Sequence, residues 1–221
     1  MCGRFTLSQP AEAIASSFQL NEVPTLEPRY NIAPTQRVPT VLQKTGGDRQ
    51  FQMLRWGLIP SWAKDLAMGA KLINARGETV AEKPSFRSAF RHRRCLIIAD
   101  GFYEWQRLEG KKQPFYFRLH NGQPFAFAGL WEHWQDPEGE AIESCTIVTT
   151  EANKLLQPIH DRMPVILDPK DYDLWLDPTF QNPEQLKQLL QPLSSEAMTS
   201  YPVSTKVNNP ANNTPECVNS L

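Results

Sequence analysis

Short runs of apolar residues, many of them alternating with polar ones, predict a strand-rich chain. Residues 95–99 are continuously apolar, which is typical of a strand buried on both faces, and residues 102–107 alternate. Residues 38–43 and 49–56 lie on either side of a Gly-Gly pair, and this spacing predicts a β-hairpin. We therefore expect a sheet in the middle of the chain.

The second half of the chain continues this pattern. Residues 115–119 and 125–131 flank Asn121-Gly122, a strong signal for a tight hairpin turn. Further strands are expected at residues 144–149, 165–167 and 201–207.

Helices are expected mainly near the two ends of the chain. Ser8 is placed to cap a short helix that has Pro10 in its first turn. Helical patterns recur at residues 170–176 and 183–190, and residues 151–156 suggest a single helical turn. Strands in the middle with helices at the ends indicate an α+β fold with a strongly curved or barrel-like sheet.

No repeat and no change of composition marks a second domain. We therefore expect residues 1–207 to form a single domain. The proline-rich stretch around Arg29-Tyr30-Asn31 is expected to be a loop, and the Asn- and Pro-rich residues 208–221 a loose tail.

Composition narrows the class of protein. Of 221 residues, 40% are hydrophobic and 21% are charged, as in ordinary globular proteins. No apolar run is long enough to span a bilayer, and the N-terminus has no secretory pattern, so we expect a cytoplasmic protein with no membrane partner. The net charge of −1 does not by itself indicate a nucleic-acid partner. A local basic cluster at residues 87–94 is most simply a solvated surface.

Four cysteines stand at positions 2, 95, 145 and 217, and no two have the short spacing of a zinc site or redox motif. We therefore expect no metal and no other cofactor. Cys95 and Cys145 lie in apolar runs and are predicted to be buried, whereas Cys217 lies in the polar tail.

Cys2 differs from the others because removal of the initiator Met would make it the N-terminal residue. It would then carry an amine with a pKa of roughly 7.7–8.0 and a thiol with a pKa of roughly 8.5 on adjacent carbons. Such a 1,2-aminothiol can condense with an aldehyde to an iminium and then close a thiazolidine ring. Taken alone, a cysteine after Met is better explained as an accident of a frayed terminus.

Six short motifs occur in order along the chain. They are MCGRF, RYNIAPTQ, RWGLIPSWAK, LINARGET, ADGFYEW and IHDRMPVIL. Together they resemble the SOS-response-associated peptidase (SRAP) family of abasic-site-shielding proteins, over residues 1–207. The resemblance implies a bifurcated sheet that forms a pseudo-barrel with flanking helices. It also implies a thiazolidine crosslink between the processed N-terminal cysteine and a ring-opened abasic site in single-stranded DNA.

The resemblance gives roles to four catalytic candidates. Cys2 matches the crosslinking position, and Asn74 in LINARGET is expected to hold the opened sugar through its amide. Glu104 in ADGFYEW is expected to move protons during iminium formation and ring opening. His160 in IHDRMPVIL is expected to exchange a proton near neutral pH.

Five further residues are candidates for DNA contacts. Trp62 and Trp105 are expected to stack on bases, although core packing explains either one nearly as well. Arg4, Arg76 and Arg162 are expected to contact phosphates. Whether Lys83, Arg87 or Arg91 also contributes stays open.

The predicted partner is therefore single-stranded DNA with abasic sites, bound by a monomer that would associate with the nucleoid in a bacterium. The predicted activity is crosslinking, with N-terminal self-processing and lyase-type reversal, and no general proteolysis. Two alternatives remain. One is an N-terminal-nucleophile amidohydrolase such as a glutaminase, in which the thiol attacks an amide. The other is a single-stranded DNA-binding module without covalent chemistry.

Overall fold

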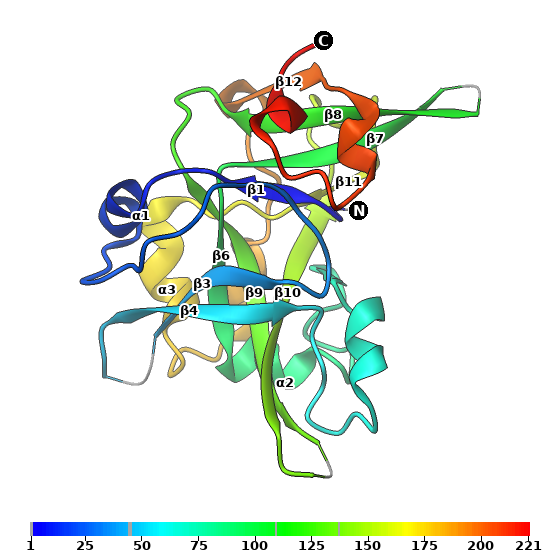
Figure 1. Cartoon of the computed structure of the whole chain (residues 1–221). Helices are drawn as coiled ribbons and strands as arrows, with labels where there is room; N and C mark the ends of the chain where they lie inside the picture. The colour runs from blue at the N-terminus through cyan, green and yellow to red at the C-terminus, as the bar shows by residue number, and fades with distance from the viewer. Residues whose placement is uncertain (1, 44–45, 109, 137) are drawn as a thin grey trace.

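Two β-sheets form the body of the molecule. The computed structural model (Figure 1) describes residues 2–43, 46–108, 110–136 and 138–221. The smaller sheet has the strand order β12-β8-β7-β1-β2. Its strands are β1 (Phe5–Leu7), β2 (Arg29–Ile32), β7 (Gly101–Leu108), β8 (Lys111–Leu119) and β12 (Met198–Pro202).

The larger sheet closes into a barrel. Its strands are β3 (Arg37–Gln43), β4 (Arg49–Trp56), β5 (Asn74–Arg76), β6 (Arg94–Ala99), β9 (Phe125–Gln135), β10 (Ala141–Glu151) and β11 (Arg162–Pro164). Strands β10-β4-β3-β6-β9 pair in that order, and β9 also pairs with β10, so these five form a ring. Strands β5 and β11 add to β10 outside the ring. The expected α+β fold with a pseudo-barrel of strands is confirmed.

The core explains why these segments are strands. Every residue of β6 is buried, which matches the continuous apolar run in the sequence. The ring of Phe5 from the smaller sheet packs 5.1 Å from Trp56 and 5.7 Å from Phe127, measured between ring centroids. Such edge-on aromatic contacts hold β1 against the barrel.

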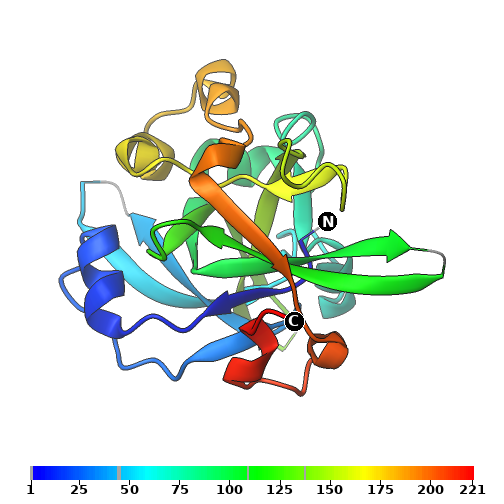
Figure 2. The same cartoon turned by 90° about the horizontal axis from the view of Figure 1, so that it is seen from above.

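Short helices lie outside the sheets (Figures 1 and 2). They are α1 (Ala11–Phe18), α2 (Arg87–His92), α3 (Tyr172–Leu176) and α4 (Pro183–Gln188), with several single 3₁₀ turns. The prediction that Ser8 caps α1 was wrong. The cap residue is Pro10, whereas the Ser8 hydroxyl donates to Asp100 Oδ2 at 2.8 Å. Among the described residues, no helix is long and apolar enough to cross a bilayer.

The predicted hairpin across Asn121-Gly122 was wrong. The turn exists, since Gly122 adopts a positive φ of 66° and its N–H donates to Leu119 O. However, β8 pairs with β7 and β12, whereas β9 pairs with β6 and β10. Strand β9 is buried along most of its length, and in the barrel it pairs with a strand on each side. The turn therefore links two different sheets.

Residues 208–221 are not a loose tail. The Asn31 amide donates to the carbonyl oxygens of Asn209 (3.0 Å) and Asn212 (2.8 Å), and the Tyr30 N–H donates to Asn213 Oδ1 at 2.7 Å. Cys217 is fully buried. The stretch around Arg29 expected to be a loop is strand β2, and its polar groups bind the polar tail. Hydrogen bonds therefore hold this segment in place, although its composition is typical of disorder.

Gly129 on β9 leaves no room for a side chain. A Cβ there would lie 2.7 Å from Cys95 Sγ and 2.9 Å from Ile97 Cγ1 on the neighbouring strand. We expect Gly129→Ala to lower the free energy of unfolding by about 1–3 kcal/mol, as measured by denaturant titration. In a double-mutant cycle, Cys95→Ala should recover part of this loss, by at least about 0.5 kcal/mol. Strict additivity would mean that the contact with Sγ does not matter.

Candidate functional site

The first residues of the chain are held in place rather than frayed. In the antiparallel pairing of β1 with β7, Phe5 lies opposite Phe102, and the Tyr103 N–H donates to Arg4 O at 3.0 Å. Continued by two residues, this register brings Gly3 opposite Glu104. Cys2 is fully buried, and its thiol lies 3.8 Å from Arg4 O.

Asn74 binds the backbone of Cys2 from the other sheet. Strand β5 runs parallel to β10, with Asn74 beside Ile147. The Asn74 side-chain amide donates to Cys2 O at 3.0 Å. Its Oδ1 is buried and accepts no hydrogen bond from the described residues. Asn74 therefore positions Cys2 and keeps a buried acceptor beside it.

Glu104 is a buried carboxyl near the Cys2 thiol. The residue is 2% exposed, and burial raises the pKa of its carboxyl to about 7. Burial, with the nearby charge of Glu104 as the second cause, raises the pKa of the Cys2 thiol far above its ordinary value. At neutral pH the thiol is therefore protonated, whereas Glu104 exists in both protonation states.

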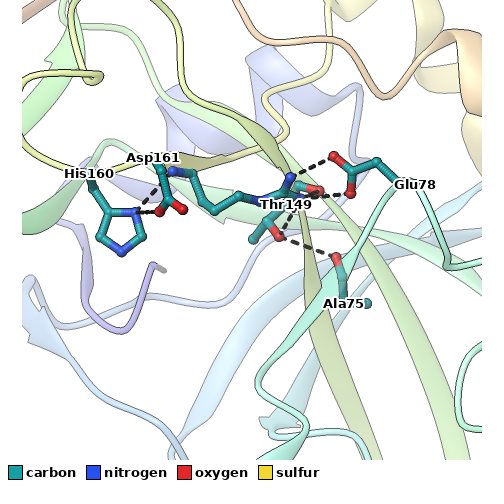
Figure 3. Close-up of polar contacts among 6 residues, drawn as sticks. Ala75, Glu78, Thr149, His160 and Asp161 are labelled. Atoms are coloured by element: carbon teal, nitrogen blue, oxygen red, sulfur yellow. Dashed lines mark hydrogen bonds and ion pairs between the residues drawn. The ribbon is translucent and has the colours of Figure 1, made fainter.

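His160 lies in the loop before β11. Its Nδ1 is 3.0 Å from the Arg162 N–H and 3.0 Å from Asp161 Oδ1 (Figure 3). The first contact requires an unprotonated Nδ1 and the second a protonated one. Burial lowers the pKa of His160, and the Asp161 side chain is 87% exposed, so the neutral form prevails at pH 7. Nδ1 then accepts from the backbone, and Nε2 carries the proton.

Arg162 is already paired with a carboxylate. Its guanidinium donates to both Glu78 oxygens, at 2.5 and 2.9 Å, and to Thr149 O at 2.8 Å. In Figure 3, His160 and Asp161 lie at the left of the view and Glu78 at the right, with Thr149 between them. The hydrogen bond from Arg162 is the main reason that the pKa of Glu78 is lowered. Arg162 ties β11 to the segment after β5, so a phosphate contact would have to compete with Glu78.

A cavity of about 830 Å³ opens beside Glu104 and His160. It is lined by Arg4, Glu104, Trp105, Gln106, Arg107, Lys112, Pro158, Ile159, His160, Asp161 and Asn208. The structure thus brings together four of the predicted site residues, namely Arg4, Glu104, Trp105 and His160. Asn74 joins them through its bond to Cys2, while Trp62, Arg76 and Arg162 are not among the lining residues.

The C-terminal segment forms one wall of the cavity. The Trp105 indole N–H donates to Asn208 Oδ1 at 2.7 Å. Arg4 donates to Asn31 Oδ1 at 2.8 Å and to Val207 O at 2.7 Å. The sequence reasoning missed Asn208 because it lies in the segment interpreted as a tail. No local motif signals its role.

The remaining DNA-contact candidates lie on the surface. Trp62 is 56% exposed in the irregular stretch after β4, and Arg76 is exposed at the end of β5. An exposed Trp is not core packing, which leaves its ring free to stack. Lys83, Arg87 and Arg91 are also exposed. Within the described part of the chain, no cluster of three or more His, Cys, Asp or Glu side chains could hold a metal ion.

Comparison with known proteins identifies relatives along the whole chain. The chain is 48% identical over 224 residues to the abasic site processing protein YoqW of Bacillus subtilis (strain 168), with 100% of both chains covered. It is 38% identical over 222 residues to the abasic site processing protein HMCES of Xenopus tropicalis, covering 87% of this chain and 66% of that protein.

Solved structures share the fold. A crystal structure of a protein from Bacteroides thetaiotaomicron matches with a TM-score of 0.88 at 28% identity, covering 100% of both chains. A protein from Bordetella bronchiseptica matches with a TM-score of 0.78 at 28% identity, covering 92% of this chain and 100% of that one. A model of the SOS response associated peptidase (SRAP) family matches residues 1–210, and with the full-length identity to YoqW it establishes that this chain belongs to the SRAP family.

Proposed function

We propose that this protein shields abasic sites in single-stranded DNA by forming a covalent thiazolidine crosslink through Cys2, as part of the DNA damage response. The observation that carries the proposal is the burial of Cys2 between Asn74 and Glu104, at a terminus that would otherwise fray. The name that its relatives share, abasic site processing protein, supplies the substrate class.

The chemistry begins with a free amine. The nitrogen of a peptide bond is not basic, so the bond between residue 1 and Cys2 must be cleaved first, by an aminopeptidase or by self-processing. The amine then attacks the aldehyde carbon of the ring-opened abasic sugar, and loss of one water gives an iminium. Addition of the thiol sulfur to the iminium carbon, with release of the thiol proton, closes the thiazolidine ring.

Glu104 is suited to both proton transfers. With a pKa of about 7 its carboxylate can accept a proton from the Cys2 ammonium, and later from the thiol. Because the thiol pKa is raised, the thiol is a poor nucleophile until such a base removes its proton. This order makes the amine the first nucleophile and the thiol the second.

The sugar itself needs acid–base help. An abasic sugar exists mostly as a closed hemiacetal, and opening it moves a proton between the hydroxyl and the ring oxygen. Neutral His160 carries its proton on Nε2 and can donate it, while the buried Oδ1 of Asn74 can accept from a sugar hydroxyl. The same groups would catalyse the reverse, lyase-type reaction.

Single-stranded DNA fits the surroundings of the cavity. Trp105 lines it and Trp62 is exposed, and unstacked bases can stack on such rings with about 1–3 kcal/mol per base. Arg76, exposed two residues from Asn74, is placed to contact a phosphate near the lesion. We propose that the protein acts as a monomer.

The first prediction concerns Cys2. The protein, with residue 1 removed, should form a heat-stable, one-to-one adduct with single-stranded DNA that carries one abasic site, with the mass of both minus one water. Intact-mass analysis measures this. Cys2→Ala should give no stable adduct, whereas Cys2→Ser should give at most one that borohydride must trap, because a hydroxyl closes the ring poorly.

Two controls make this test decisive. A variant with a non-removable extension before Cys2 should bind DNA without crosslinking, since it has no free amine. An undiminished stable adduct from Cys2→Ala would refute the proposal. If Cys2→Ala protects the DNA as well as the parent does, a non-covalent DNA-binding module would be the better description.

The second prediction concerns Glu104 and His160. Glu104→Gln and His160→Gln should each slow single-turnover crosslinking by about 10²–10⁴-fold. They should slow release of a preformed crosslink as well, because forward and reverse reactions share one transition state. Binding of a non-reactive abasic analogue should stay within a few-fold of the parent. Normal rates in both variants would remove these residues from the proposed site.

The third prediction follows from the raised pKa of Glu104. Because this pKa is about 7 when folded and 4.5 in an unfolded chain, the folded protein binds more protons between these pH values. The contribution of Glu104 to the free energy of unfolding is therefore most favourable at and below about pH 4.5, and it falls as the pH rises to about 7. Glu104→Gln cannot ionise, so its melting temperature relative to the parent should be higher at pH 8 than at pH 5. A pH-independent difference would show that Glu104 ionises normally.

A further inference from the structure

Two cations face each other across the β7–β8 hairpin. Arg107 and Lys112 are directly opposite in the antiparallel register, and both are exposed. Like charges at such positions repel and destabilise a strand pair. Neither residue forms an ion pair with the part of the chain that the structure describes. Figures 1 and 2 both show this hairpin extending beyond the rest of the molecule.

The two cations belong to the cavity of the proposed site. Arg107 and Lys112 both line it together with Glu104 and His160. Burial is the main reason that the pKa of His160 is lowered, and the positive charge of Arg107 is a smaller cause in the same direction. Both cations therefore border the same cavity as the proposed reaction centre.

Arg4 is a third cation at this cavity. Its guanidinium donates to the uncharged oxygens of Asn31, Val207 and Asn208. Its charge is therefore not neutralised by any of these partners. The exposed carboxylate among the lining residues is Asp161, which contacts His160. Three cations thus meet one exposed carboxylate and the buried carboxyl of Glu104.

We propose that Arg107 and Lys112 form a subsite for one phosphate of the DNA strand that passes through this cavity. An anion bound between them would remove their mutual repulsion and replace it with two favourable contacts. The planar guanidinium of Arg107 can bind two phosphate oxygens, while Lys112 supplies a compact charge. This inference rests on the proposed function only for the identity of the ligand as single-stranded DNA.

The other lining groups favour a nucleotide over a free anion. A cavity of about 830 Å³ is far larger than one phosphate, and Trp105 offers a ring on which a base can stack. Trp105 and Arg107 point to the same face of β7, since they are two residues apart on one strand. Asn208 fixes the edge of the Trp105 indole at 2.7 Å. Together they provide one contact for a base and one for the adjoining phosphate.

The hairpin offers a matched control. Lys111 is exposed on the same strand as Lys112, next to it in sequence, but it does not line the cavity. Substitution of either lysine by glutamine changes the net charge equally, so only a direct contact distinguishes the two.

The experiment measures equilibrium binding of Cys2→Ala protein to single-stranded DNA with a non-reactive tetrahydrofuran abasic analogue, across a range of salt concentrations. Arg107→Gln combined with Lys112→Gln should weaken binding at low salt about tenfold. Its slope of log affinity against log salt should be smaller by about 0.7, the value for one phosphate on a single strand. Of the two single variants that remove one charge each, Lys112→Gln should weaken binding, whereas Lys111→Gln should stay within twofold of the parent with an unchanged slope.

Stability gives a second readout. Removal of one charge from a repelling pair should leave the melting temperature of Arg107→Gln unchanged or raise it, so a loss of binding cannot come from unfolding. Arg107→Lys keeps the positive charge, so it should bind DNA with most of the parent's affinity, unlike Arg107→Gln. If Lys111→Gln weakens binding as much as the double variant does, or if the double variant keeps the parent slope, the subsite is refuted.

The same measurements separate this inference from the proposed crosslink. If the parent with Cys2 bound DNA with the expected slope but formed no adduct, the phosphate subsite would stand and the crosslink would fail. If the adduct formed while the double variant kept the parent slope, the crosslink would stand and the subsite would fail. If single-stranded DNA did not bind at all, both would be overturned.

Discussion

The antiparallel pairing of β1 with β7 is the constraint on which the site depends. It is secured at both ends of β1. Phe5 inserts its ring into the barrel core, and the buried carboxylate of Asp100 accepts hydrogen bonds from the Ser8 N–H at 2.6 Å, from the Ser8 hydroxyl and from Thr6. A hydrogen bond to a charged group typically contributes about 1.5–3 kcal/mol to stability. Residues 2–4, which precede β1, are therefore held in a fixed position against the core.

The site lies where the two sheets meet, and neither sheet could build it alone. Asn74 comes from β5, which adds to the barrel through β10, whereas Glu104 comes from β7 in the smaller sheet. His160 lies in the loop that leads to β11, whose pairing with β10 fixes the position of the loop. Strands β5 and β11 both pair with β10, and β9 closes the barrel against β10. Asn74 and His160 are therefore positioned by the same strand. Precise placement of a nucleophile requires this kind of support.

Local patterns in the sequence were sufficient wherever one strand face or one short turn decides the structure. The apolar run of β6, the β3–β4 hairpin and the alternation of β7 all follow from periodicity. They were insufficient where distant segments compete for the same polar groups. Asn121-Gly122 gives the signal of a hairpin, yet β9 pairs with β6 and β10 and is buried along most of its length in the barrel. Asn213 lies in a stretch with the composition of a tail, yet the amides of β2 hold it.

For the candidate site, the motifs suggested which residues to consider but not how they are arranged. The sequence places Arg162 beside His160, and only the fold reveals Glu78 as the partner that occupies its guanidinium. Asn208 carries no motif at all, and its contact with Trp105 depends on the return of the chain end to the cavity. Arg107 and Lys112 look like ordinary surface charges until the β7–β8 register sets them opposite each other. Such arrangements depend on long-range pairing, which a single sequence read locally does not contain.

The protonation state of Cys2 also bears on which chemistry this terminus can perform. In an N-terminal-nucleophile amidohydrolase, the thiol attacks the substrate first and the amine serves as its base, so a low thiol pKa is an advantage. Here burial and the nearby Glu104 raise the pKa of the thiol, and both effects oppose a thiolate. The same carboxylate favours an ammonium or iminium beside it, since opposite charges attract strongly where water is excluded. An environment that suppresses the sulfur anion and stabilises a nitrogen cation is the one that the proposed reaction needs, in which the amine attacks an aldehyde before the thiol reacts.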